Sequence, residues 1–140
     1  MTTLAAALAG TWELERWELV YEDGRPSECP LGDDAVGYLM YTADGHVSAS
    51  LARAGRAPMD GSEPGKARAF DTYFGYEGRY VVRDGTVRHQ IAIAPDPALT
   101  GVESVRHVQL EGDRLVLSGP DFAAASPRSH RIVWRRARAG

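Results

Sequence analysis

Two polar residues of this sequence fall where apolar residues are expected, and both have side chains capable of chemistry. His89 alternates on one face with Ile91, and Arg106 shares a face with Val108. A buried arginine keeps its proton, so it could hold a carboxylate, enolate or carbonyl oxygen of a ligand. A histidine can move a proton near neutral pH, and the hydroxyl of Tyr76 could orient it or donate to an oxyanion. Such a set would suit enolisation, dehydration or ring closure.

Both residues also have structural interpretations. His89 could be a core imidazole whose nitrogens are satisfied by a tyrosine hydroxyl or a backbone carbonyl. Arg106 could belong to an internal ion pair or a cluster of carbonyls. A haem-binding role for His89 is a further, minor alternative. The sequence has no Ser-His-Asp order, paired-carboxylate spacing, P-loop or Rossmann glycine pattern, so hydrolase, glycosidase and nucleotide-dependent functions lack support.

A predicted hairpin positions the histidine. Residues 76–82 and 87–93 each alternate with a period of two, and Asp84-Gly85 between them is a hairpin turn signal. Tyr76 and Tyr80 then lie on the same side of the hairpin as His89.

Six further segments show strand patterns. The first begins at Trp12 and changes phase near Arg16, which indicates a bulge. The others cover residues 36–41, 46–51, 103–110, 115–117 and 130–136. Eight strands joined mostly as sequential hairpins predict an all-β fold, an eight-stranded antiparallel up-and-down β-barrel. Because such a barrel can enclose one small ligand, its interior is the expected site.

Two helices are predicted outside the barrel. Thr3 can cap a short helix over residues 4–9. Ser62 can cap a second helix, which we expect to end before Gly75 and to form a lid over residues 62–74. The lid helix is expected at one end of the barrel and Trp12 at the other.

Strand alternation and the lid define the predicted site. His107 has the opposite parity to Arg106 and should point outward, while His46, Asp71 and His130 are weaker candidates. The predicted catalytic residues are His89, Arg106 and Tyr76, and the predicted ligand-binding residues are Tyr38, Met40, Ser48, Phe70, Tyr73 and Tyr80.

Several motifs resemble a known family. Gly10-Thr11-Trp12 resembles the Gly-x-Trp signature of lipocalins, in which a basic residue near the C-terminus packs over the tryptophan; here Arg135 or Arg136 would do so. Over nearly the whole chain, the sequence resembles the bacterial and fungal lipocalin-like domain family. The motifs that carry this resemblance are Pro30-Leu31-Gly32, Val36 to Gly45, and Phe70 to Phe74 leading into Gly78-Arg79-Tyr80. The resemblance implies a lipocalin-like barrel, and some similar barrels act in natural-product pathways as cofactor-free cyclases or isomerases.

Composition limits the remaining possibilities. At 140 residues, the chain is expected to form one domain over residues 1–140. A net charge of -3 with scattered basic residues argues against nucleic acid as a partner. Cys29 is the single cysteine, so we expect no disulfide and no metal site. The N-terminus lacks the pattern of a signal peptide and no run is long enough to span a membrane, so a cytoplasmic location without membrane association is expected.

These observations favour a cofactor-independent cyclase or isomerase acting on a small hydrophobic metabolite of polyketide or terpenoid type. The alternative is a non-catalytic carrier or sensor of such a molecule. The identity of the ligand and the oligomeric state stay open.

Overall fold

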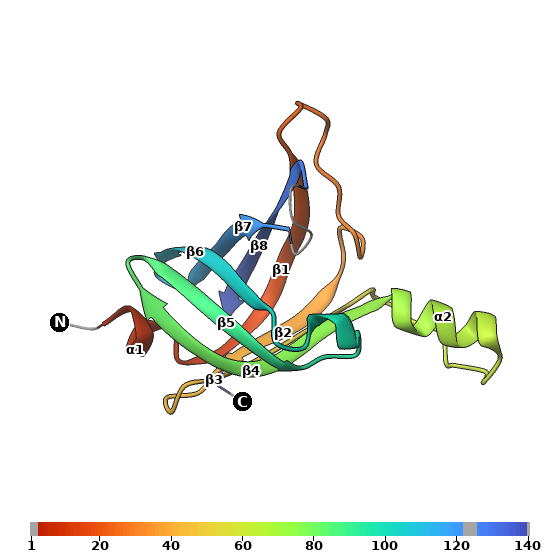
Figure 1. Ribbon diagram of the computed structural model, residues 1–140, viewed down its shortest axis with the longest axis horizontal. Helices are drawn as coiled ribbons and strands as arrows, with labels where there is room; N and C mark the ends of the chain where they lie inside the picture. Colours follow the sequence, from red (N-terminus) through yellow and green to blue (C-terminus); the bar gives the residue numbers. More distant parts are fainter. Residues whose placement is uncertain (1–2, 122–125, 140) are drawn as a thin grey trace.

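The computed structural model describes residues 3–121 and 126–139, and its strands close into one antiparallel barrel, as predicted (Figure 1). Each strand pairs with the next in the chain, and the last pairs with the first. The strands are β1 (Gly10–Tyr21), β2 (Val36–Tyr41), β3 (His46–Ala52), β4 (Tyr73–Arg83), β5 (Thr86–Ile93), β6 (Glu103–Glu111), β7 (Arg114–Pro120) and β8 (Arg128–Arg136).

Local sequence features set the register of these strands. The pairing of β1 with β8 shifts between Leu14 and Arg16, which confirms the predicted bulge and turns Trp17 inward. Asp84 and Gly85 adopt φ values of 51° and 73°, the left-handed conformation that the tight turn from β4 to β5 requires.

One end of the barrel is closed by α1 (Leu4–Leu8) and Trp12. The Trp12 side chain is fully buried, and its Nε1–H donates to the carbonyl of Leu8 across 2.9 Å. The guanidinium of Arg136 lies 4.2 Å from the centre of the Trp12 ring and donates to the carbonyl of Ala7 across 2.8 Å. Arg136 is therefore the basic residue that covers the tryptophan, whereas Arg135 pairs with Glu15 on the surface.

The second predicted helix is present as α2 (Glu63–Asp71), capped by Ser62. It ends earlier than expected because Tyr73 and Phe74 already belong to β4, where they pair with Ala52 and Leu51. Gly65 is its buried residue, and Figure 1 shows α2 projecting away from the barrel at the end opposite α1. The helix therefore extends from that end and does not cover it. A short 3-10 helix, η1 (Pro97–Leu99), joins β5 to β6.

Candidate functional site

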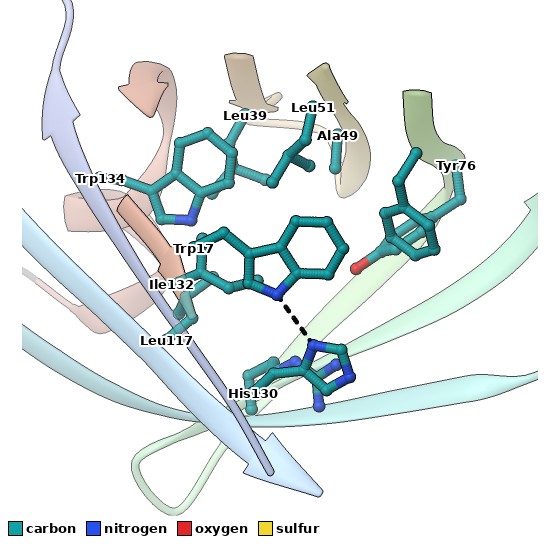
Figure 2. Close-up of a pocket in the computed structure, with 11 residues that line it drawn as sticks. Trp17, Leu39, Ala49, Leu51, Tyr76, Leu117, His130, Ile132 and Trp134 are labelled. Atoms are coloured by element: carbon teal, nitrogen blue, oxygen red, sulfur yellow. Dashed lines mark hydrogen bonds between the residues drawn. The ribbon is translucent and has the colours of Figure 1, made fainter. Parts of the chain in front are cut away.

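The barrel encloses a small cavity between its centre and the end opposite α1. About 20 Å³ of it is open to the centre of a water molecule, which is room for about one water. Side chains from both sides meet across this space (Figure 2). The lining is mostly aromatic and aliphatic and consists of Trp17, Leu39, Ala49, Leu51, Phe74, Tyr76, Arg106, Leu117, His130, Ile132 and Trp134.

Arg106 gives this apolar lining a permanent charge. Its residue is 3% exposed, and Nη1 donates to the carbonyls of Val105 and Pro120 across 3.2 and 3.0 Å. Gly119 leaves room for it, since a Cβ at that position would lie 3.0 Å from Nη1. Burial lowers the pKa of Arg106, and the nearby charge of Asp121 acts in the opposite direction. A guanidinium nevertheless keeps its proton inside a protein, so the cavity wall is cationic.

His89 is held between two tyrosines. The hydroxyl of Tyr41 lies 2.6 Å from Nε2, and the hydroxyl of Tyr76 lies 2.6 Å from Nδ1. Burial, with a smaller contribution from the charge of Arg106, lowers the pKa of His89 to about 3. The imidazole is therefore neutral near pH 7 and carries one N–H, so one tyrosine donates to it and the other accepts from it.

This arrangement matches the structural interpretation of His89. Burial raises the pKa of both Tyr41 and Tyr76, so their hydroxyls also stay neutral. Because both ring nitrogens are engaged, neither is open to a ligand or to a haem iron. Tyr76, by contrast, lines the cavity, and Figure 2 shows its hydroxyl pointing into it.

A second histidine lies on the cavity wall. The indole N–H of Trp17 donates to Nδ1 of His130 across 3.0 Å, and Nε2 of His130 lies 2.9 Å from a carboxylate oxygen of Asp121 (Figure 2 shows the first bond). Since Nδ1 accepts, the proton of the neutral ring lies on Nε2 and is donated to Asp121. Burial lowers the pKa of His130, which favours this neutral form.

The structure places four of the predicted site residues on the inner face. Tyr76 and Arg106 line the cavity, and His89 is hydrogen-bonded to the hydroxyl of Tyr76. Tyr80 is also buried, but its hydroxyl donates to the carbonyl of Thr42 and so lies away from the cavity. His107 is exposed, on the outer face.

The expected inward position of three strand residues was wrong. Tyr38 and Met40 are 51% and 43% exposed, because Leu39 and Tyr41 occupy the inner face of β2. Ser48 lies opposite Met40 in the register, and both line a shallow groove on the outer surface. Residues 36–41 are apolar at nearly every position, so alternation alone does not identify the buried face.

The two predicted ligand-binding residues of the lid also lie outside the barrel. Phe70 is 50% exposed on α2. Tyr73 is part of β4 and donates from its hydroxyl to Ser50 Oγ across 2.9 Å on the outer face. Their predicted contact with a ligand in the barrel depended on a lid that covers the opening, and α2 points away from it.

The sequence-based prediction missed the aromatic residues that dominate the cavity, Trp17, Phe74 and Trp134, and it ranked His130 only among the weaker candidates. A signal existed for Trp17, since the phase change near Arg16 turns it inward. The parity of β8 likewise places His130, Ile132 and Trp134 on one face. Phe74 had no such signal, because its helical spacing with Phe70 concealed the start of β4.

Neither a metal-binding cluster nor a membrane-spanning helix is found in the described part of the chain. Across residues 3–121 and 126–139, no three His, Cys, Asp or Glu side chains are grouped closely enough to hold a metal ion. None of the helices within the same residues has the length and apolar character needed to cross a membrane.

Comparisons with known proteins agree with this architecture. A lipocalin-like protein from Bacteroides uniformis ATCC 8492 has 17% identity and a TM-score of 0.51, with 93% of this chain and 98% of that chain covered. An uncharacterized protein from Bacteroides eggerthii DSM 20697 has 14% identity and a TM-score of 0.50, with 93% and 99% covered. The lipoprotein YedD from Klebsiella pneumoniae subsp. pneumoniae MGH 78578 has 16% identity and a TM-score of 0.48, with 96% and 74% covered. At these identities the likeness to the two Bacteroides proteins shows the fold alone.

A search of curated proteins finds no match to the chain. The family model of the lipocalin-like domain, however, matches residues 9–137, from the strand that carries Trp12 to the end of the barrel. This is a fold that suits the binding of small hydrophobic ligands. The chain belongs to the lipocalin-like domain family.

Proposed function

We propose that this protein binds one small hydrophobic molecule inside the barrel, with a carboxylate or carbonyl oxygen of that molecule against Arg106. The observation that carries the proposal is a buried guanidinium on the wall of an otherwise aromatic and aliphatic cavity. A guanidinium presents several N–H donors in a fixed planar fork, which suits a carboxylate or carbonyl oxygen. The apolar lining would supply most of the affinity through burial of the ligand's body.

The ligand needs more space than the unliganded cavity offers. Room for one water does not admit a metabolite, so a lining side chain has to move. Trp17 is the best candidate, because its ring lies in the middle of the cavity between Phe74 and His130, at centroid distances of 5.4 and 5.7 Å. Rotation of the Trp17 indole would enlarge the cavity, and it would break the hydrogen bond from Trp17 to His130.

The geometry favours a carrier or sensor over a cyclase or isomerase. An acid-base reaction needs a proton carrier that can reach the ligand. His89 is engaged by two tyrosines, and His130 is engaged by Trp17 and Asp121. The predictions of catalysis, of a polyketide- or terpenoid-like substrate and of a cytoplasmic location remain predictions.

The test is titration of the protein with 2-naphthoate, monitored by tryptophan fluorescence. Replacing Arg106 by Met keeps an unbranched apolar stem and removes the charge, so naphthoate binding should weaken by roughly 2 to 4 kcal/mol, the scale of losing a preorganised oxyanion donor. Arg131→Met is the matched control, because Arg131 pairs with Glu18 at the surface and is not among the cavity-lining residues.

Thermal unfolding of the same variants separates binding from structure. If Arg106 is mainly a structural cation, its loss should lower stability by roughly 3 to 5 kcal/mol by leaving a partner charge buried. An Arg106→Met protein that is destabilised and still binds naphthoate as tightly as the wild type would overturn the proposal.

A further inference from the structure

We infer that the ligand carries a second oxygen acceptor, which receives a hydrogen bond from the indole N–H of Trp134. This inference rests on the proposed function, because it concerns the same cavity. It adds a requirement on the chemistry of the ligand, which should be polar at both ends and apolar between them.

Trp134 has an unused donor in a buried place. Its residue is 1% exposed and lines the cavity, and within the described part of the chain its Nε1 has no hydrogen-bond partner. The other two tryptophans differ in this respect. Trp12 donates to Leu8 and Trp17 donates to His130. Buried indole N–H groups normally find an acceptor, so the exception on the cavity wall indicates a missing partner.

The position of Trp134 separates its N–H from the guanidinium. His130 and Trp134 are four residues apart on the inner face of β8, a distance of roughly 13 Å along the strand. Arg106 lies near the level of His130, because Gly119 pairs with His130 and its missing Cβ makes room for Arg106. The two donors therefore lie toward different ends of the cavity.

The wall between these donors is apolar. Ile132 lies between His130 and Trp134 on β8 and pairs with Trp17 of β1 on one side and Leu117 of β7 on the other. In Figure 2, Ile132 and Leu117 lie between Trp134 and His130, and the Trp17 ring occupies the middle of the view. A molecule that fills this space along the strands would place an oxygen at each end and a flat or branched hydrocarbon in the middle.

Two probes of similar size test the second contact. In 6-acetyl-2-naphthoate the group far from the carboxylate offers a ketone oxygen, and in 6-isopropyl-2-naphthoate a methyl group takes its place. The wild-type protein should bind the acetyl probe about tenfold more tightly, the value of one added hydrogen bond in a buried site. Trp134→Phe should lose or reverse this preference, because it keeps an aromatic ring, removes the donor and leaves the ketone oxygen buried without a partner.

Trp12→Phe is the control variant. It also removes an indole N–H, but that donor faces Leu8 at the closed end, so the preference for the acetyl probe should persist. Equal binding of both probes by the wild type, with loss of binding in Arg106→Met, would overturn the second contact and leave the proposed function in place. Failure of the wild type to bind either probe would overturn both proposals.

A crystal structure of the wild-type complex with 6-acetyl-2-naphthoate supplies a readout that does not depend on a variant. The expected result is a hydrogen bond from Trp134 Nε1 to the ketone oxygen. The cavity has room for one water, which could also accept this bond. A complex in which Nε1 donates to a water instead of the ketone would overturn the inference.

Discussion

The indole N–H of Trp17 donates to Nδ1 of His130 across 3.0 Å, and this bond holds the indole ring in the space that a ligand would occupy. Nδ1 of His130 can accept this hydrogen bond only while it carries no proton. Asp121 favours that tautomer, because its carboxylate accepts a hydrogen bond from Nε2–H. The unliganded barrel is therefore filled by its own side chains, as eight-stranded barrels can be.

Replacing Trp17 by Ala should open the cavity. We expect the variant to lose about 3 to 5 kcal/mol of unfolding free energy, because a large buried ring is removed. It should also bind 2-isopropylnaphthalene more tightly than the wild type does, since apolar cavities accept apolar guests and no side chain has to be displaced. Titration calorimetry measures the binding, and chemical denaturation measures the stability.

Trp12→Ala provides the comparison for this experiment. Trp12 is also buried, but it lies at the closed end and is not among the cavity-lining residues. Its loss should destabilise the protein without improving the binding of 2-isopropylnaphthalene. Unchanged affinity in Trp17→Ala would show that Trp17 does not occupy the ligand's space.

The fold was predictable because its signals are local. Asp84-Gly85 marks a turn by its chemistry, and the phase change at Arg16 marks a bulge by its alternation. The inward positions of His89 and Arg106 followed in the same way, since each stands among apolar neighbours of the same parity.

The composition of the site was harder to predict, because it depends on contacts between distant segments. Tyr38 and Leu39 both have large side chains with mostly apolar surface, and closure of the barrel decides which of them is buried. The partners of His89 come from two different strands, and the pairing of Trp17 with His130 joins residues 113 positions apart. Sequence spacing carries no information about such pairs.

The buried imidazole of His89 should make stability depend on pH. The folded protein keeps His89 neutral down to its pKa of about 3, whereas the unfolded chain binds a proton below about pH 6.5. Stability from this residue is therefore complete above pH 6.5 and is lost as the pH falls toward 3. Between pH 7 and pH 5, the loss should reach about 2 kcal/mol.

His89→Gln isolates this contribution, because an amide can still donate to one tyrosine and accept from the other without titrating. Unfolding of both proteins by urea across the pH range should show a flatter profile for the variant. His107→Gln, which changes an exposed residue on the outer face of β6, is the control for replacing a histidine outside the barrel interior. Parallel profiles for the wild type and His89→Gln would contradict the prediction.

The closed end of the barrel should depend on Arg136 and not on its neighbour. Arg136 stacks over Trp12 and donates to the carbonyls of Ala7 and Ala9, so it joins β8 to the first strand and to the end of α1. Arg136→Met should lower the unfolding free energy by about 2 to 3 kcal/mol, through loss of the cation–π contact and of these hydrogen bonds.

Arg135→Met is the matched control on the same strand. Arg135 is exposed and pairs with Glu15, and a surface ion pair of this kind contributes little to stability. Urea denaturation compares the two variants, and hydrogen exchange of the α1 amides locates the effect, since exchange there should accelerate only in Arg136→Met. Equal destabilisation by the two substitutions, with equal α1 exchange, would mean that Arg136 acts as a surface charge and that Trp12 closes the barrel without it.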